Sequence, residues 1–450
     1  MKKKALFVTS LFMLSPFSHA LDLVEAYQRA KSTDPNWQAN VYQYQADQLN
    51  LGIAGGNLLP AVTLSGNITR KHQEMNQIDT SNTGSGNFFP TQDLVTSTST
   101  TKQIAVTARQ PLFRIDAWQG YKQVKTSVQL SEVTLKLQQQ QHILNVADAY
   151  FNVLRQQALT ITNLEEEKAL LEQLKMMNAK LKEGLVARSD VSEADAQYQN
   201  ANANRIATGV QLILAQEQLA QLIGPYQKQL AVLRDDFQYQ KPIPASLLEW
   251  SNLAQSQNLD ILQARLQQQY ANDERRVEKA ALYPQVDAVL SYGFNKQTPE
   301  TIISGNGQFD QIGVEMNWNV FNGGITKKKI EKSSVNVKKT EALLDAAIRK
   351  ANTDVKKSFL QVETDQATLQ ARKTAMQSSQ LVSRASHAQY NEGLKSMVDV
   401  LLAQRNAFAS KQDYVNAQYD YILNVLRLKA SVGQLTEQEI EQMNTWLILK

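Results

Sequence analysis

The sequence of 450 residues contains no cysteine, so no disulfide is available to stabilise the fold. Histidine is scarce, with four in total, and none of the four has a second ligand at the spacing that metals require. The motifs Gly-x-Ser-x-Gly and His-Glu-x-x-His do not occur. These absences predict a protein that is not an enzyme and that binds neither a metal nor a cofactor.

Charge of one sign is also lacking. Lys and Arg total 47 against 43 for Asp and Glu, and three of the lysines lie at positions 2 to 4. The lysine clusters Lys327 to Lys329 and Lys338-Lys339 contain no interleaved aromatic residues and follow a helical pattern. This pattern favours a solvated helix face over a nucleic-acid site, so we expect no nucleic-acid partner.

Long hydrophobic runs are absent beyond residue 20, because no stretch reaches the roughly 18 apolar residues of an ordinary transmembrane helix. Residues 1 to 20 resemble a secretory signal, with Lys2 to Lys4, an apolar stretch from Ala5 to Leu14, and the cleavage site Ser18-His19-Ala20. We therefore expect an exported mature chain that begins at Leu21. If it crosses a membrane, strands must do so.

Proline is missing from two very long stretches. Residues 115 to 182 contain one glycine, Gly120, near the start, and residues 325 to about 392 contain none. Each stretch predicts one continuous helix, and the first would be roughly 100 Å long at ~1.5 Å per residue. Shorter helices are predicted to follow, at about 190–223 and 397–432.

Four segments show the alternation of apolar and polar residues that is typical of half-buried strands. They lie at about 61–72, 102–113, 285–295 and 310–320. Polar, glycine-containing loops, Lys71 to Thr101 and Gln297 to Asp310, separate the members of each pair. The sequence therefore predicts two β-hairpins.

The chain also contains an internal duplication. The phrase KLKEGLVARSDV, Lys180 to Val191, returns in the second half as QYNEGLKSMVDV, Gln389 to Val400. Two structural repeats, 21–233 and 234–450, each contain a helix, strand, loop, strand, very long helix, turn and helix. Duplication at this scale predicts one composite architecture and not a string of unrelated domains.

Four strands of about ten residues cannot close a barrel by themselves, because about eight is the smallest number that gives a filled interior. Pooling of strands from several copies would solve this, and the strand length matches that of tilted bilayer-spanning strands. Aromatic residues near the strand ends favour a membrane interface, although ordinary core packing would explain each one equally well. An exported coiled-coil scaffold or adhesin without channel activity is the alternative, but it does not explain the two hairpins.

The chain resembles the TolC family of outer-membrane channels in drug efflux and type I secretion, along essentially its whole mature length. The motifs that carry the resemblance, specific in their order and spacing, are Ala149 to Leu154, Gly184 to Ala187, Leu262 to Leu266, Phe321 to Gly324 and Met397 to Leu401. The resemblance implies an α+β membrane protein: a trimeric 12-stranded β-barrel, four strands per protomer, continued by an α-helical coiled-coil barrel. A small mixed equatorial domain would form near 234–258 and 436–449.

The same resemblance implies a Gram-negative outer-membrane exit duct that extends into the periplasm. Its partners would be two further copies of the chain, a periplasmic adaptor protein, an inner-membrane pump of the RND, ABC or MFS type, and outer-membrane lipid. The duct would be passive, and the adaptor and pump would open it at its periplasmic tip.

The repeated turns would form that tip. By resemblance, the gate is held by contacts at Ser189, Asp190, Tyr390 and Lys395, with Asp190 accepting from the Tyr390 hydroxyl and pairing with Lys395. Lys395 stands where the family has arginine, so the two parallel hydrogen bonds that a guanidinium can make are lost. These gate contacts, called the lock below, should therefore be weaker. Independently of function, Ser189 and Ser396 are expected to cap the helices that follow the turns.

Asp399 matches one member of a paired-carboxylate ring at the entrance, but the partner position is Leu402, so a trimer would carry three carboxylates. Ser396 and Asp399 also fit a capping box, and both roles can hold. Gly184-Leu185 and Gly393-Leu394 would contact the adaptor by resemblance; as an alternative they are turn residues that end the long helices.

Overall fold

The structure is a computed structural model that describes residues 20–79, 91–226, 229–234, 239, 242–298 and 306–448. The expected signal, residues 1–19, lies outside the described residues. Throughout the described ranges, no helix has an apolar segment long enough to cross a bilayer. The elements are, in chain order, α1 Leu23–Thr33, α2 Pro35–Gly56, β1 Ala61–Asp79, β2 Thr91–Phe113, α3 Ile115–Lys182, α4 Arg188–Ile223, β3 Val232–Leu233, α5 Leu247–Gln257, α6 Leu259–Ala280, β4 Gln285–Thr298, β5 Gly307–Asn317, α7 Ile325–Asn391, α8 Met397–Ser431, α9 Glu437–Asn444 and β6 Leu447–Ile448.

The chain forms two compact units, and both halves of the sequence contribute to each. The strand unit comprises residues 44–132 and 264–344, and the helical unit comprises 1–43, 133–263 and 345–450. The units therefore cut across the sequence repeats 21–233 and 234–450, which stay an interpretation of the sequence. The boundary between the two units falls at residues 132/133 within α3 and at 344/345 within the equivalent helix α7. Equivalent segments of the two repeats therefore belong to the same unit.

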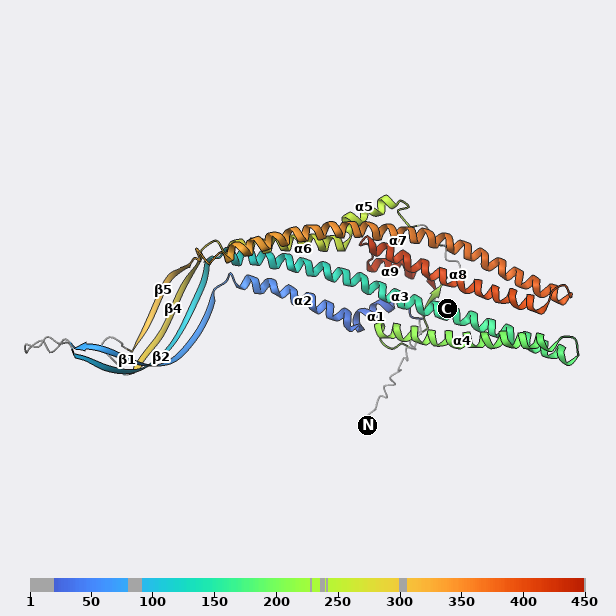
Figure 1. Cartoon of the computed structure of the whole chain (residues 1–450), viewed down its shortest axis with the longest axis horizontal. Coiled ribbons are helices and arrows are strands. Elements are labelled where there is room, and N and C mark those ends of the chain that lie inside the picture. The colour runs from blue at the N-terminus through green and yellow to red at the C-terminus, as the bar shows by residue number, and fades with distance from the viewer. Residues whose placement is uncertain are drawn as a thin grey trace, which may run out of the picture. The chain divides into compact units, whose positions relative to one another are not determined.

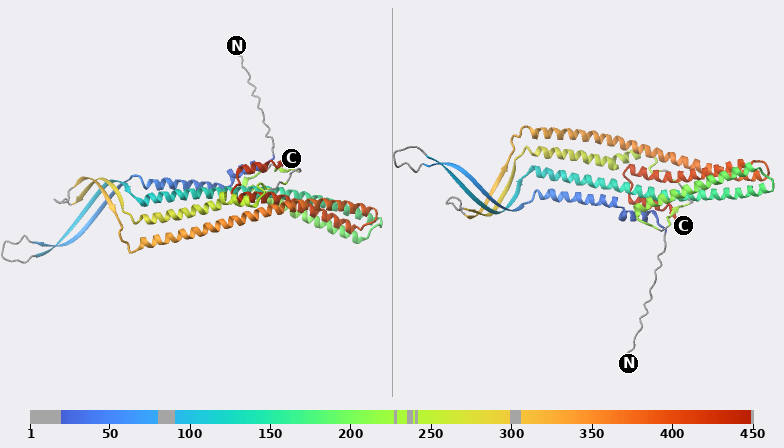
Figure 2. Two further views of the ribbon diagram at one scale, coloured as in Figure 1. Left: turned by 90° about the horizontal axis from the view of Figure 1, so that it is seen from above. Right: turned by 60° about the horizontal axis from the view of Figure 1, so that its bottom comes forward.

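A four-stranded antiparallel sheet dominates the strand unit, in the order β1-β2-β4-β5 (Figure 2). On one face the apolar side chains are exposed: Ile68 is 73% exposed and Ile312 85%. The opposite face carries mostly polar and small residues, such as Thr107 and Ser291, whose hydroxyls lie 3.1 Å apart. An exposed apolar face opposite a polar one is the pattern of strands whose outer face contacts lipid.

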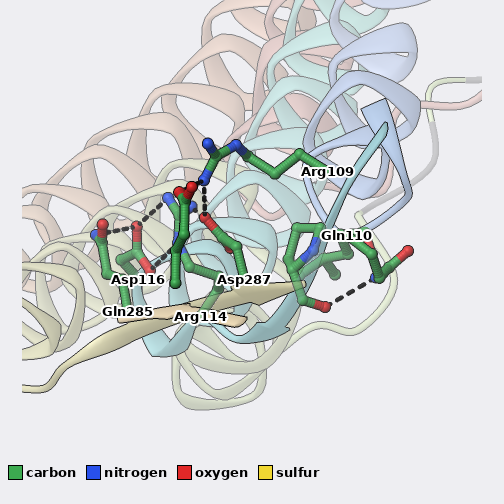
Figure 3. Close-up of polar contacts among 9 residues, drawn as sticks. Arg109, Gln110, Arg114, Asp116, Gln285 and Asp287 are labelled. Atoms are coloured by element: carbon green, nitrogen blue, oxygen red, sulfur yellow. Dashed lines mark hydrogen bonds and ion pairs between the residues drawn. The ribbon is translucent and has the colours of Figure 1, made fainter. Parts of the chain in front are cut away.

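Charged side chains on the polar face join three strands near the helices (Figure 3). Arg109 Nη1 on β2 lies 3.3 Å from Asp287 Oδ2 on β4 and 2.8 Å from Glu315 Oε2 on β5. Close by, Arg114 Nη2 and Gln285 Nε2 donate to Asp116 Oδ2, both at 3.0 Å. These contacts hold the register, since a shift by one residue would move every partner to the other face.

The first hairpin corrects the sequence-based expectation, which placed strands at 61–72 and 102–113 with a loop between them. Pairing continues from Lys71 opposite Ser99 out to Asp79 opposite Thr91, so most of the expected loop is strand. Alternation failed to reveal this because both faces of the extension are polar where side chains are described, while threonine-rich segments still suit a strand. In the second hairpin β4 extends to Thr298, and β5 is Gly307–Asn317, not 310–320.

Two long helical hairpins, α3–α4 and α7–α8, make up most of the helical unit, and their turns lie at the same end of it (Figure 1). α3 has 68 residues and α7 has 67. Absence of proline allows this length, and packing of apolar side chains stabilises it. The main core includes, from α3, Ile143, Val146, Tyr150 and Phe151, and from α8, Ile422 and Leu426.

A small mixed α/β part of the helical unit combines three distant chain segments. β3 pairs with β6, and Leu21 bridges to Leu230. The buried Tyr150 hydroxyl lies 3.0 Å from Leu21 O and 2.9 Å from Ala231 O. Sequence analysis assigned this part to residues near 234–258 and 436–449; the N-terminal residues of the described chain are a further component that it missed.

Candidate functional site

The two repeated turns have the same backbone geometry. Gly184 has φ 74° and Gly393 φ 76°, a conformation that glycine adopts without strain. Each glycine N–H donates to the carbonyl three residues earlier, at 2.9 and 3.0 Å, and each following leucine N–H donates to the carbonyl five residues earlier, at 2.9 and 2.8 Å. This is the Schellman motif, and it explains why Gly and Leu recur in register.

The helices that follow the turns begin differently. Ser396 caps α8: its Oγ accepts from Asp399 N at 3.2 Å, while Asp399 Oδ2 accepts from Ser396 N at 3.1 Å. The expected capping box is therefore confirmed. Ser189 does not cap α4, because that helix already begins at Arg188 with Ala187 at the cap position. The sequence-based prediction placed this start too late, because it took Ser189 as the cap. Serine also occurs inside the first turn of a helix, which is where Ser189 lies.

Asp190 stabilises the start of α4 in place of the serine. Its Oδ2 accepts from Ala187 N at 3.3 Å, the position that a carboxylate in the first turn favours. Ser189 beside it is exposed. The expected contacts of Asp190 with Tyr390 and Lys395 are not among the hydrogen bonds within the described part of a single chain. Asp190 itself is half-buried.

Tyr390 instead contacts Lys180 on the other hairpin. Lys180 Nζ donates to the Tyr390 hydroxyl at 3.3 Å and lies 4.6 Å from the ring centroid, a cation–π distance. The hydroxyl lies 3.9 Å from Met177 Sδ, a weak acceptor. Its proton thus remains available to a stronger acceptor such as a carboxylate.

Lys395 contacts its own hairpin, because its Nζ donates to Ser386 Oγ at 2.9 Å. Sequence analysis missed Lys180, Met177 and Ser386 as neighbours of the gate residues. Their signal was weak, since the contacts join positions on different helical turns or hairpins. Only Lys180 falls within the repeated phrase itself.

A small core lies beneath the turns and joins the two hairpins. It contains Leu170, Met177, Ala194, Ala201, Met397, Val400 and Leu401. Polar contacts also join the two hairpins: the buried Gln173 Nε2 lies 2.7 Å from Met397 Sδ, and Gln412 Nε2 donates to Asn163 Oδ1 at 2.7 Å. Burial also raises the pKa of Glu166, which is partly offset by Arg405.

Asp399 is exposed and ionised at neutral pH. Hydrogen bonds from the Ser396 side chain and backbone lower the pKa of its carboxyl, and Lys395 adds a smaller effect in the same direction. Leu402, one turn further along α8, is 50% exposed. One carboxylate and one apolar side chain therefore lie on neighbouring turns of α8, as the sequence indicates.

Two exposed leucines project from the turns. Leu185 is 67% exposed and Leu394 76%, although both residues are apolar. Matched exposed apolar side chains at equivalent places suit a contact with a partner protein. In the part of the chain that the structure describes, no group of three His, Asp or Glu side chains could hold a metal ion.

Comparison with known proteins agrees with this architecture. The family model described as "Outer membrane efflux protein" matches residues 26–225 and 250–434. The chain is 29% identical to outer membrane protein TolC of Escherichia coli K12, over 97% of this chain and 87% of that protein. It is 25% identical to the alkaline protease secretion protein AprF of Pseudomonas aeruginosa, over 97% and 89%.

Solved structures show the same fold at low identity. The Campylobacter jejuni CmeC outer membrane channel superposes with a TM-score of 0.78 at 16% identity, covering 95% of this chain and 90% of that one. The open state of the Neisseria gonorrhoeae MtrE outer membrane channel gives 0.74 at 18%, covering 93% and 92%. The expected fold class and outer-membrane localisation are confirmed. The chain belongs to the outer membrane efflux protein family and is an exit duct of the Gram-negative outer membrane for efflux or type I secretion.

Proposed function

We propose that three copies of this chain pool their sheets into one closed barrel, and that an adaptor protein and an inner-membrane pump of the RND, ABC or MFS type open the duct at the helical turns. The observation that carries this proposal is the sheet: β1 and β5 each have one neighbour among the described strands, and the outer face is apolar. A soluble scaffold has no use for such a face. The duct transports cargo without catalysing a reaction.

The closed state is held by contacts between turns of neighbouring protomers. Asp190 accepts a hydrogen bond from the Tyr390 hydroxyl, whose acceptor among the described residues of its own chain is a thioether, and pairs with Lys395 once that side chain leaves Ser386. Each exposed pair is worth ~0.2 to 1 kcal/mol, so three copies sum to about 0.6 to 3 kcal/mol. An adaptor that binds the open state can overcome that bias.

Asp399 forms the aperture ring, as three carboxylates that attract cations to the entrance. The leucines of the two turns form the adaptor contact, because Leu185 and Leu394 are exposed apolar side chains with no role in the core beneath them. Gly184 and Gly393 shape that contact by letting each turn close tightly.

Single-channel recording in planar bilayers tests the lock. Asp190→Ala combined with Lys395→Ala should raise conductance, and open probability should rise about tenfold for ~1.4 kcal/mol. Lys182→Ala with Glu183→Ala is the control, since it also removes one positive and one negative charge, both from exposed residues at the end of α3 beside the first turn. Lys395→Arg should lower open probability, because arginine restores a bidentate contact. Channels that stay mostly closed in the double variant would refute the lock.

Cross-linking tests the adaptor contact. Because the chain has no native cysteine, any cross-link from it must come from the introduced residue. Cysteine at Leu185 or Leu394 should capture the adaptor in cells, whereas cysteine at Ile206, an exposed residue along α4, should not. Equal capture at all three positions would show that the turns have no special role.

A further inference from the structure

Three cations lie on the lipid-facing side of the sheet, at the end away from the helices. Arg70, Lys102 and Lys296 occupy the same face as Ile68 and Phe294, because strand side chains alternate. In the register, Lys102 is opposite Ile68 on β1 and opposite Lys296 on β4. All three cationic side chains are exposed. They therefore form a positive rim directly above the apolar face.

The pairing of Lys102 with Lys296 is unfavourable without a ligand. Like charges directly opposite on adjacent strands destabilise a sheet. Among the described residues, none forms an ion pair with Arg70, Lys102 or Lys296. The nearest acids on this face are Glu74, which lies 3.6 Å from His72, and Asp310, which is opposite Tyr292, about 13 Å of strand rise away.

A hollow lies beside the two lysines. Its volume is about 750 Å³, and the side chains that line it on this face include Ile68, Ile104 and Phe294 as well as both lysines. Gly66 opens a notch in the apolar face between these residues, since it is opposite Ile104 and has no side chain. The site thus combines an apolar floor with a cationic edge.

We propose that this hollow binds a phosphorylated glycolipid of the outer leaflet. Its phosphates lie between Lys102 and Lys296, with Arg70 as a third cation, and an acyl chain lies along Ile104 and Phe294. The side of the membrane follows from connectivity: the other ends of these strands lead into the periplasmic helices. Basic pockets at a membrane surface recognise anionic headgroups in this way.

Lysines also extend to a membrane interface without any specific ligand. The feature that separates the two cases here is the fixed geometry. Two lysines are held side by side by adjacent strands, next to a hollow, so one phosphate can contact both ammonium groups. A general attraction would not distinguish phosphates on a glycolipid from those of other lipids, and the test uses that difference.

The test uses the full-length assembled protein, purified in phosphate-free buffer and detergent. Bound lipid is counted by native mass spectrometry, and the temperature of oligomer dissociation is measured alongside. Probes are bisphosphorylated lipid A, the same lipid with its phosphates removed, phosphatidylglycerol and inorganic phosphate. Lipid A should bind the wild type, and Lys102→Gln with Lys296→Gln should weaken this about tenfold. Lys71→Gln, at an exposed lysine on the opposite face of β1, is the matched control.

The proposal also predicts that the difference in dissociation temperature between the double variant and the wild type changes sign when lipid A is added. Without lipid, the double variant should dissociate at the same or a higher temperature than the wild type, because the lysine repulsion is gone. With lipid A, it should dissociate at a lower temperature. Equal stabilisation by the dephosphorylated lipid or by phosphatidylglycerol would overturn the proposal, as would undiminished lipid A binding by the double variant. A variant that assembles normally without lipid shows that folding is intact.

Discussion

At the scale of single residues, Gly293 shows where the sheet tolerates no side chain. A Cβ there would lie 2.5 Å from Ile104 O and 2.8 Å from Phe309 Cζ. Because the first atom belongs to the backbone of β2, relief requires the strands to move. We expect Gly293→Ala to cost about 1 to 3 kcal/mol and to lower the temperature of oligomer dissociation. At Gly66 the nearest atom would be 3.6 Å away, so Gly66→Ala should leave it nearly unchanged. Equal melting of both variants would contradict this account.

The capping box at Asp399 predicts a pH dependence. Its carboxyl has a lowered pKa in the folded chain, so its stabilising effect is present above the unfolded value of about 3.9 and is lost as the pH falls through the folded value. We expect Asp399→Asn to melt below wild type at pH 7, by circular dichroism of the helices, and the difference to shrink as the pH falls below about 3.9 and to vanish below the lowered pKa of the folded chain. Ser396→Ala, which removes the cap, should cost ~1 kcal/mol at neutral pH. A difference in melting temperature between Asp399→Asn and the wild type that persists in acid would exclude the carboxylate as its source.

Sequence reasoning found the residues of the site whose partners are local. Ser396 and Asp399 are three positions apart on one helix start, so their capping box was visible as a pattern. The contact of Lys180 with Tyr390 joins two hairpins and could not be found this way, because no single-sequence pattern reports which helix faces another. The roles of Ser189, Asp190, Tyr390 and Lys395 in a lock stay predictions.

At the scale of elements, alternation worked where the two faces of a strand meet different surroundings. β4 and the first part of β1 separate apolar from polar residues, and both were predicted. The outer part of the first hairpin has no such contrast, so it was assigned to a loop. α3 could be predicted from composition because proline is absent over its length, whereas the start of α4 depended on which residue supplies the cap.

The extension of the first hairpin predicts an independent ribbon. β2 pairs with β4 only from Thr100 onward, so among the residues that the structure describes, the pairs from Lys71–Ser99 outward have no third strand. A two-stranded ribbon of this kind contributes little stability. Joining His72 to Thr98 through Asn-Gly, a sequence suited to a tight hairpin turn, should therefore leave oligomer dissociation and conductance unchanged. As a control, an equal shortening within the four-stranded region should abolish assembly. Loss of the oligomer in the first variant would show that the ribbon has partners in the assembly.

At the scale of the whole molecule, the edges of the sheet predict how copies meet. β1 and β5 are separated by two strands, which places them about 14 Å apart within one chain, beyond the ~7 Å that a disulfide can bridge. If β1 of one copy pairs with β5 of the next, cysteines at Ser65 and at one of Gln311, Gly313 or Glu315 should form a disulfide between chains in intact membranes. The product on denaturing gels should be a covalent trimer. The pair Thr107→Cys with Gln311→Cys, on strands that β4 separates, should give none. A chain that stays monomeric for every β1–β5 pair would exclude a barrel assembled from its edges.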